Sequence, residues 1–143
     1  MKKYKILEDV ALADIAIEAN GKDLNELFEN CAFAIFEESA TVKKISGKEK
    51  KTIKLNAKNE GDLLFDFLSE IIFLKDTHSM IFKSSKVKVE KKKAGYALHA
   101  ELAGDKIDAT KHELHNDIKA ITLHMFTVEK AKSGWKALFV VDV

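Results

Sequence analysis

The sequence predicts an α+β domain in which two amphipathic helices pack on one face of a mainly antiparallel sheet. Three observations favour this fold class. The chain has 143 residues, 46% hydrophobic and 33% charged, as expected for one globular domain. Two segments repeat apolar residues at helical spacing, whereas most of the remainder alternates with a period of two. No low-complexity tract or internal repeat interrupts the chain, so residues 1–143 are expected to form a single domain.

The two helices are expected near residues 23–35 and 59–75. The first follows the turn Asn20-Gly21, and Asp23 can cap its start. The second can be capped by Asn59 and has acidic residues in its first turn, where the helix dipole favours them. The apolar faces consist of Leu24, Leu27, Phe28, Cys31, Ala32 and Ile35 in the first helix and Leu63, Leu64, Phe67, Leu68, Ile71 and Ile72 in the second.

Period-two alternation predicts the strands. The alternating segments are 13–19, 50–55, 86–90, 96–102 and 135–141, and Lys93-Ala94-Gly95 marks a hairpin turn. Residues 118–128 are apolar at both alternating positions, which is typical of a central strand buried on both faces. On this interpretation His124 is a core or half-buried residue.

The charged residues and the single cysteine exclude several classes of protein. All 24 basic residues are lysines, and with 23 acidic residues the net charge is +1. The chain therefore has no overall field that attracts polyanions, and no guanidinium for bidentate contacts to phosphate or guanine. Because Cys31 is the single cysteine, the chain can form neither an intramolecular disulfide nor a Cys-rich zinc site. Charges near the N-terminus and the lack of an 18-residue uncharged run predict a cytoplasmic protein without a membrane span.

Two aspartates interrupt apolar strand patterns. Asp14 is out of phase with Ile15 and Ile17, and Asp142 lies beside the C-terminal carboxylate of Val143. Adjacent anions repel each other, and a divalent cation would reverse that repulsion. Asp14, Asp142 and the terminus would form an all-oxygen site suited to calcium, magnesium or manganese. The alternative is that both aspartates are solvated strand residues.

The segment Lys111-His112-Glu113-Leu114-His115 is the other candidate for chemistry. Its histidines are three residues apart, whereas the zinc metalloprotease pattern needs them four apart, so a polar loop is expected here. Lys111 can supply a point charge beside a metal or phosphate site. The lysine clusters at 43–54 and 83–93 lack interleaved aromatic residues, which favours solvated strand edges over a nucleic-acid platform.

Several motifs, taken in order, resemble the archease family. Ala13-Asp14-Ile15, Asn20-Gly21 and Leu24–Glu29 are similar to its "AD" strand, glycine turn and "LxELFE" helix start. Residues 62–70 resemble its "LLxxFLxELL" helix and 118–124 its "VKAVTYH" strand, and Lys111-His112 and the Val-Val-Asp-Val ending also match. The resemblance extends from about residue 4 to the last residue.

The resemblance implies an activator of the RNA-splicing ligase RtcB. Archeases promote guanylylation of the ligase's active-site histidine, allow multiple turnover and broaden its nucleotide use. The resemblance implies a metal ion, often calcium, held by Asp14, Asp142 and Val143, and an activating role for Lys111. It implies contact with tRNA through the ligase, and no contact with DNA or a membrane.

This chain departs from the family pattern beside the first aspartate. Many members read "HTAD", whereas this chain reads Ala11-Leu12-Ala13-Asp14, with Glu8 and Asp9 upstream as possible additional acids. Two other classes remain open from the residues alone. One is a metal-dependent hydrolase using Asp14 and Asp142, which lacks an evident general base. The other is an RNA-binding or chaperone-like module that uses the lysine clusters.

Overall fold

The computed structural model describes residues 4–7 and 14–143. Within these residues the chain forms two α-helices, one short 3₁₀ helix and seven strands. In chain order they are β1 (Tyr4–Leu7), β2 (Asp14–Gly21), α1 (Leu24–Ser39), η1 (Val42–Lys44), β3 (Glu49–Ala57), α2 (Glu60–His78), β4 (Met80–Lys92), β5 (Gly95–Lys106), β6 (Ala120–Ala131) and β7 (Gly134–Asp142). The predicted α+β fold class is confirmed.

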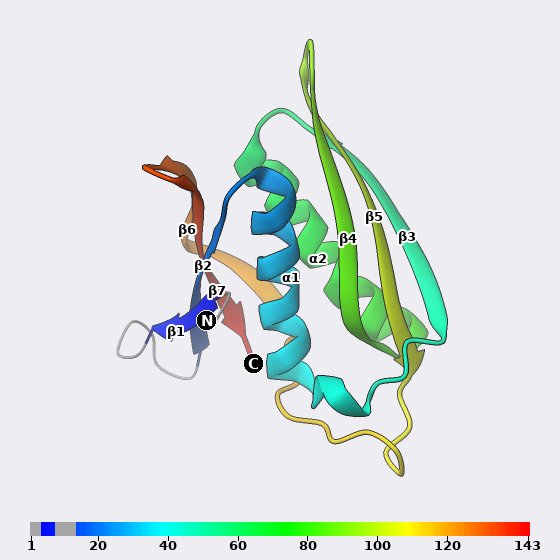
Figure 1. Cartoon of the computed structure of the whole chain (residues 1–143). Coiled ribbons are helices and arrows are strands. Elements are labelled where there is room, and N and C mark those ends of the chain that lie inside the picture. Colours follow the sequence, from blue (N-terminus) through cyan, green and yellow to red (C-terminus); the bar gives the residue numbers. More distant parts are fainter. Residues whose placement is uncertain (1–3, 8–13) are drawn as a thin grey trace.

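The strands form two antiparallel sheets rather than the one that was expected. The first has the order β1-β2-β7-β6 and the second the order β3-β5-β4. Both helices lie between the sheets, α1 against β2 and β4, and α2 against β3 and β6 (Figure 1). One continuous core fills the space between the layers, and its largest fully buried side chains include Phe28, Phe67 and Phe139.

Both helices begin where the sequence predicts. The carboxylate of Asp23 accepts a hydrogen bond of 2.8 Å from the backbone N–H of Glu26, and the Asn59 side chain accepts one of 2.8 Å from that of Asp62. These side chains satisfy backbone donors that the first helical turn leaves unpaired. The helices are longer than expected at their C-terminal ends, because α1 continues to Ser39 and α2 to His78.

Strand β6 corrects the prediction of a central strand at residues 118–128. It is an edge strand, and its register with β7 breaks between Thr122 and Thr127. Leu123 in this break is 74% exposed, and Met125 has a φ of 58°, in the left-handed region. His124 is exposed, so the expectation that it is half-buried or in the core is wrong. The apolar run is therefore divided between residues that pack inward and a bulge that projects outward.

Two features that the sequence analysis did not predict complete the fold. Strand β1 pairs with β2, and the Tyr4 hydroxyl lies 2.9 Å and 3.1 Å from the carboxylates of Glu37 and Glu38 on α1. The edge strand β4 is covered by α1, because Glu29 and Asn25 accept hydrogen bonds from its backbone N–H groups. This covering removes an exposed strand edge. No helix in the described part of the chain is long and apolar enough to cross a membrane.

Candidate functional site

The two predicted aspartates lie directly opposite each other. Asp14 is the first residue of β2, Asp142 is the last residue of β7, and they are register partners in the antiparallel pair. Directly opposed residues project from the same face of a sheet, with Cβ atoms about 5 Å apart. Asp14 is half-buried and Asp142 is exposed, so the pair is open to solvent. Two like charges at this separation destabilise the pair unless a cation or a partner's basic group lies near them.

The C-terminus and β6 bring further oxygen and nitrogen groups to this strand end. Val143, which follows Asp142 directly, is partly buried against the core. The backbone N–H of Lys119 donates a hydrogen bond of 2.7 Å to the carbonyl of Asp142, and Ala120 is also a register partner of Asp142. The last two residues of the chain are therefore held against two neighbouring strands. They do not form a free tail in solvent.

The carboxylates at this strand end provide part of the ligand set that a divalent cation needs. Among residues 4–7 and 14–143, no group of three or more His, Cys, Asp or Glu side chains is arranged to hold a metal ion. Side chains alone thus supply two carboxylates, from Asp14 and Asp142, and any further oxygen donors must come from the terminal carboxylate, the backbone or water. Oxygen donors of this kind suit hard cations. The possible additional acids Glu8 and Asp9 lie outside the described residues.

Lys111 lies in the loop between β5 and β6, and within residues 4–7 and 14–143 no hydrogen bond or ion pair joins it to Asp14 or Asp142. Its side chain is exposed, and its backbone N–H donates to the carbonyl of Asp108. The next residue, His112, is buried, with only 3% of its side chain exposed. The predicted polar loop is therefore correct for Lys111 but not for His112, which is fixed inside the protein.

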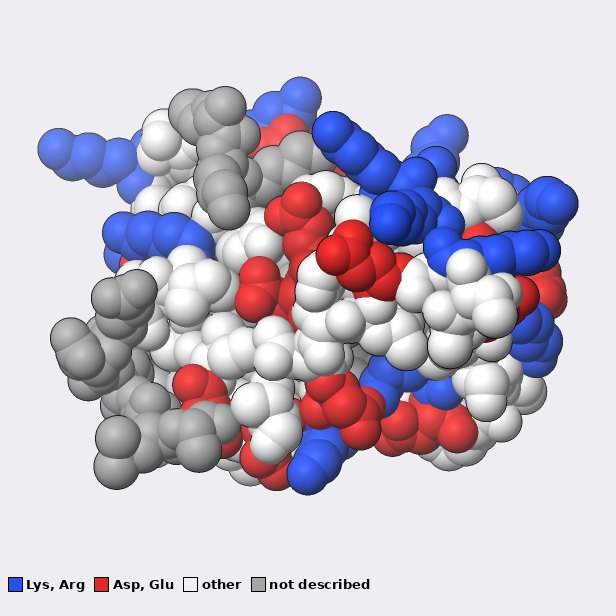
Figure 2. All heavy atoms as spheres, turned by 90° about the horizontal axis from the view of Figure 1, so that it is seen from below, with Lys and Arg blue, Asp and Glu red and all other residues white. Residues whose placement is uncertain are grey.

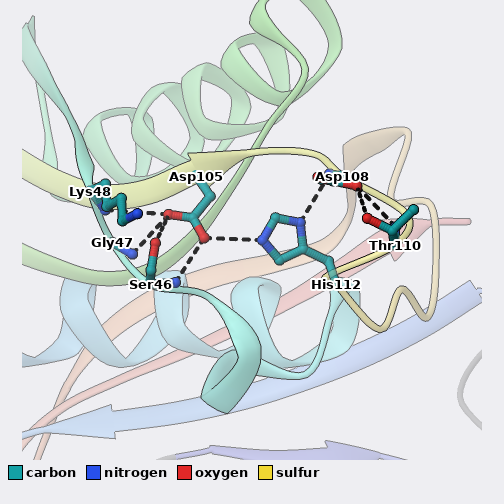
Figure 3. A network of polar contacts seen from close by, with 7 residues as sticks. All are labelled: Ser46, Gly47, Lys48, Asp105, Asp108, Thr110 and His112. Atoms are coloured by element: carbon teal, nitrogen blue, oxygen red, sulfur yellow. Dashed lines mark hydrogen bonds and ion pairs between the residues drawn. The ribbon is translucent and has the colours of Figure 1, made fainter.

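His112 is held by hydrogen bonds on both ring nitrogens (Figure 3). Its Nδ1 lies 3.0 Å from the backbone N–H of Asp108, which can only donate, so Nδ1 accepts. Nε2 then carries the proton and donates to the carboxylate of Asp105, at 3.0 Å. This assignment defines one tautomer of the neutral ring. We call the arrangement of Asp105, His112 and their partners the Asp105–His112 clamp.

The Asp105 carboxylate is the centre of this clamp. Besides His112, it accepts hydrogen bonds from the hydroxyl and backbone N–H of Ser46 and from the backbone N–H groups of Gly47 and Lys48, at 2.6–3.3 Å. Burial alone would raise the pKa of Asp105, but these donors outweigh it and hold the pKa well below its usual range. The clamp thus joins the segment before β3 to the loop that carries Lys111.

The same loop continues to the aspartate pair. Backbone hydrogen bonds connect it to the end of α1, from Thr41 to Glu113, from His115 to Ser39 and from Asn116 to Glu38. Further along, Asp117 pairs with Lys75 of α2, and Lys119 bonds to Asp142. Residues 105–119 therefore form one anchored path between the clamp and the strand end. Figure 2 views this side of the molecule and shows acidic side chains gathered across its middle.

Sequence reasoning did not find the clamp. His112 looked like part of a polar loop, and Asp105 follows the alternating strand segment without any pattern that links the two. Only the pairing of β5 with β3 and β4 brings Asp105 beside Ser46, which lies 59 residues earlier. His115 does not share a site with His112, because its Nε2 lies 2.9 Å from the Thr41 hydroxyl instead. The zinc interpretation of these histidines gains no support from this arrangement.

The fold and site define a class of small α+β proteins in which two antiparallel sheets enclose two helices and an acidic strand end faces solvent. Residues 4–143 match the Archease protein family. The chain belongs to that family, which confirms the resemblance found in the sequence. It is 36% identical to the protein archease of Pyrococcus abyssi over 144 residues, covering 100% of both chains. It is 34% identical to the protein archease of Methanosarcina mazei, covering 99% of this chain and 97% of that one.

Solved structures support the same assignment. The solution structure of protein 1598 of Methanobacterium thermoautotrophicum matches with a TM-score of 0.85 and 30% identity, over 100% of both chains. The crystal structure of an archease from Thermotoga maritima, described as a possible chaperone, matches with a TM-score of 0.61 over 93% of both chains. At 22% identity, this second match shows the fold alone.

Proposed function

We propose that this protein is a cytoplasmic activator of the RNA-splicing ligase RtcB and not itself an enzyme. In this role it promotes guanylylation of the ligase and multiple-turnover ligation. Membership of the Archease protein family supports the proposal. The observation that links the proposed function to particular residues is the register pairing of Asp14 with Asp142 at an open strand end. An open acidic strand end suits contact with a partner better than conversion of a small substrate, because among the described residues no histidine is hydrogen-bonded to Asp14 or Asp142 to serve as a general base.

The proposal includes a divalent metal site. Asp14, Asp142 and the carboxylate of Val143 would hold the ion, calcium in the first instance, with magnesium or manganese as alternatives. The opposed carboxylates and the anchored terminus fit a hard cation, which would offset their repulsion. When bound, the cation would supply positive charge and open coordination positions at the surface that meets the ligase.

Lys111 is proposed to act at the same surface. Its side chain is exposed, while its backbone is held in place by the turn at Asp108 and by the buried neighbour His112. A lysine on a fixed backbone delivers a point charge to a partner with less loss of conformational entropy than one on a free loop. The clamp therefore serves to position Lys111 and contacts no partner itself.

The test is a ligation assay with purified ligase, GTP, divalent metal and RNA ends in excess over enzyme. The protein should convert a single turnover into many, and Asp142→Ala should reduce this gain at least tenfold. The matched control is Asp66→Ala, which removes an exposed carboxylate on α2. If Asp142→Ala activates as well as the control does, the proposed role of the aspartate pair is wrong. If the unaltered protein gives no gain in turnover, the activator role itself is wrong.

A further inference from the structure

The outward face of the three-stranded sheet gathers lysines from separate parts of the sequence. Alternate residues of β3, β4 and β5 point to the core, including the buried Ile53, Leu98 and Val87. The residues between them lie on the opposite face of the sheet, because side chains alternate along a strand and the helices pack on the side of the core (Figure 1). On this face the exposed basic side chains are Lys50 and Lys54 of β3, His99 of β5, and Lys86, Lys88 and Lys92 of β4. We call this surface the basic face.

The strand register arranges these side chains in rows. His99 is the register partner of both Lys54 and Lys88, so these three residues form one row across the three strands. The next row holds Thr52, Glu101 and Lys86. Neighbouring strands lie about 4.8 Å apart and alternate residues about 6.8 Å apart, so several ammonium groups can reach one extended anion.

The acids on the basic face do not balance its lysines. Glu90 is already shared, since its carboxylate lies 3.8 Å from the ammonium of Lys88 and 3.2 Å from that of Lys92. Glu101 is the acid in the rows described above, whereas Glu90 pairs with Ala97 in the neighbouring row. The alternation in the sequence predicts two separate solvated strand edges, whereas the register places lysines of both clusters on one surface with a local excess of positive charge.

The basic face is also hollowed along these rows. One hollow of about 420 Å³ is lined by Asn25, Lys86, Val87, Lys88, His99 and Glu101. A second of about 220 Å³ is lined by residues that include Lys54, Lys88, Lys92 and His99. The two hollows share Lys88 and His99, so they lie side by side on the middle row. A chain of anionic groups following the hollows would pass between lysines of two strands.

We propose that the basic face binds the phosphate backbone of RNA without reading its sequence. Lysines approach phosphates as point charges, and contacts of this kind carry no sequence information. The rows hold no phenylalanine, tyrosine or tryptophan to stack on bases, and the chain has no arginine to read base edges. They also hold no large apolar side chain that would insert into a lipid headgroup layer. The choice of RNA among polynucleotides rests on the proposed function as a ligase activator.

Binding is tested with the protein alone and a fluorescent single-stranded RNA, by anisotropy at 50 and 200 mM salt. The altered protein is Lys54→Gln with Lys88→Gln, and the matched control is Lys130→Gln with Lys132→Gln, two exposed lysines of the β6–β7 hairpin. The unaltered protein should bind, and binding should weaken by about 100-fold between the two salt concentrations if five phosphates are neutralised. The Lys54/Lys88 variant should bind about tenfold more weakly, with a log–log salt slope smaller by about 1.4. The control should change by less than about twofold.

Three results would overturn the inference. They are an absence of RNA binding at low salt, an equal loss in both double variants, and Lys54/Lys88-dependent binding to anionic phosphatidylserine vesicles with no such dependence for RNA. Thermal unfolding of all variants checks that the substitutions leave the fold intact. The ligation assay separates this inference from the proposed function. If the protein activates the ligase and Asp142→Ala abolishes this activation, but the protein does not bind RNA, only the proposal of RNA binding by the basic face is wrong. If RNA binds through the basic face but the protein does not activate the ligase, only the proposed activator role is wrong.

Discussion

The acidic strand end and the basic face differ in how the fold assembles them. The acidic end depends on contacts between distant residues, because Asp14 and Asp142 meet through the pairing of β2 with β7. The basic face arises mainly from local alternation along each strand, with register only aligning the rows. Both regions belong to one chain whose net charge is +1. A net charge near zero is therefore compatible with two surfaces of opposite charge, and a binding partner interacts with the charge of the surface that it contacts.

Figure 2 shows that charges of one sign also gather locally on one side of the molecule. Acidic side chains lie near the middle of this view, and lysines are numerous at its upper right. Separated charges allow one protein to meet two partners, or two parts of one complex, without either surface neutralising the other.

The largest expected difference is in ligase activation. Asp14→Asn should reduce multiple turnover at least tenfold, because it removes one carboxylate of the opposed pair. Lys54→Gln with Lys88→Gln should change turnover by less than about twofold when a short RNA saturates the ligase. The measurement is product formed per ligase over many turnovers. A comparable loss in both proteins would contradict the separation of the two regions.

Next in size is the effect of the clamp on stability. Asp105→Asn should lower the free energy of unfolding by about 3 kcal/mol at pH 7, since the amide lacks the negative charge and its NH2 group faces donors that one carboxylate oxygen had accepted from. The depressed pKa of Asp105 means that this stabilisation is present above the unfolded pKa of about 4 and is lost as the pH falls below it. The difference in free energy of unfolding between the unaltered protein and Asp105→Asn should therefore decrease as the pH falls from 5 to 2.

Urea unfolding at several pH values measures this difference, and Asp66→Asn is the control because that carboxylate is exposed. A pH-independent difference would show that the charge of Asp105 is not what stabilises the clamp. The Asp105→Asn protein should also lose activation of the ligase at pH 7 while it is still folded, because the loop would no longer hold Lys111 in place. Adding Lys111→Ala to Asp105→Asn should then reduce activation little further.

Metal binding should affect only the acidic end. Calcium at 100 times its dissociation constant should stabilise the unaltered protein by about 2.7 kcal/mol. Asp142→Asn should abolish this gain and Lys54→Gln with Lys88→Gln should retain it, as measured by thermal unfolding with calcium or with a chelator. If a chelator lowers the melting temperature but leaves activation intact, the ion only joins the last strand to β2. An equal calcium effect in the Asp142→Asn protein would place the ion elsewhere.

The smallest expected effect lies in the bulge of β6. Met125 has a φ of 58°, where a side chain with a Cβ is unfavourable by about 1 kcal/mol compared with glycine. Met125→Gly should therefore raise the free energy of unfolding by up to about 1 kcal/mol in urea. Leu123→Gly is the control, since Leu123 is exposed without a positive φ and should gain nothing. A loss of stability for Met125→Gly would mean that the methionine side chain contributes packing that exceeds the strain.

The helices and most strands could be predicted because their causes are local. Asp23 and Asn59 cap the helices where their sequence positions suggest, and apolar residues at helical spacing mark the buried faces. The division into two sheets could not be predicted, because alternation marks a strand but not its neighbour. For the same reason residues 118–128 looked central, although β6 is an edge strand with a bulge.

The candidate site was predicted in part. The sequence by itself determined that Asp14 and Asp142 break apolar patterns and that the last residues carry adjacent carboxylates, since pattern and chain order are properties of the sequence. Only the tertiary structure decided that these residues are register partners, that His112 is buried against Asp105, and that two lysine clusters share one face. Each of those contacts joins residues far apart in the chain, and their positions depend on strand pairing and on packing around the core.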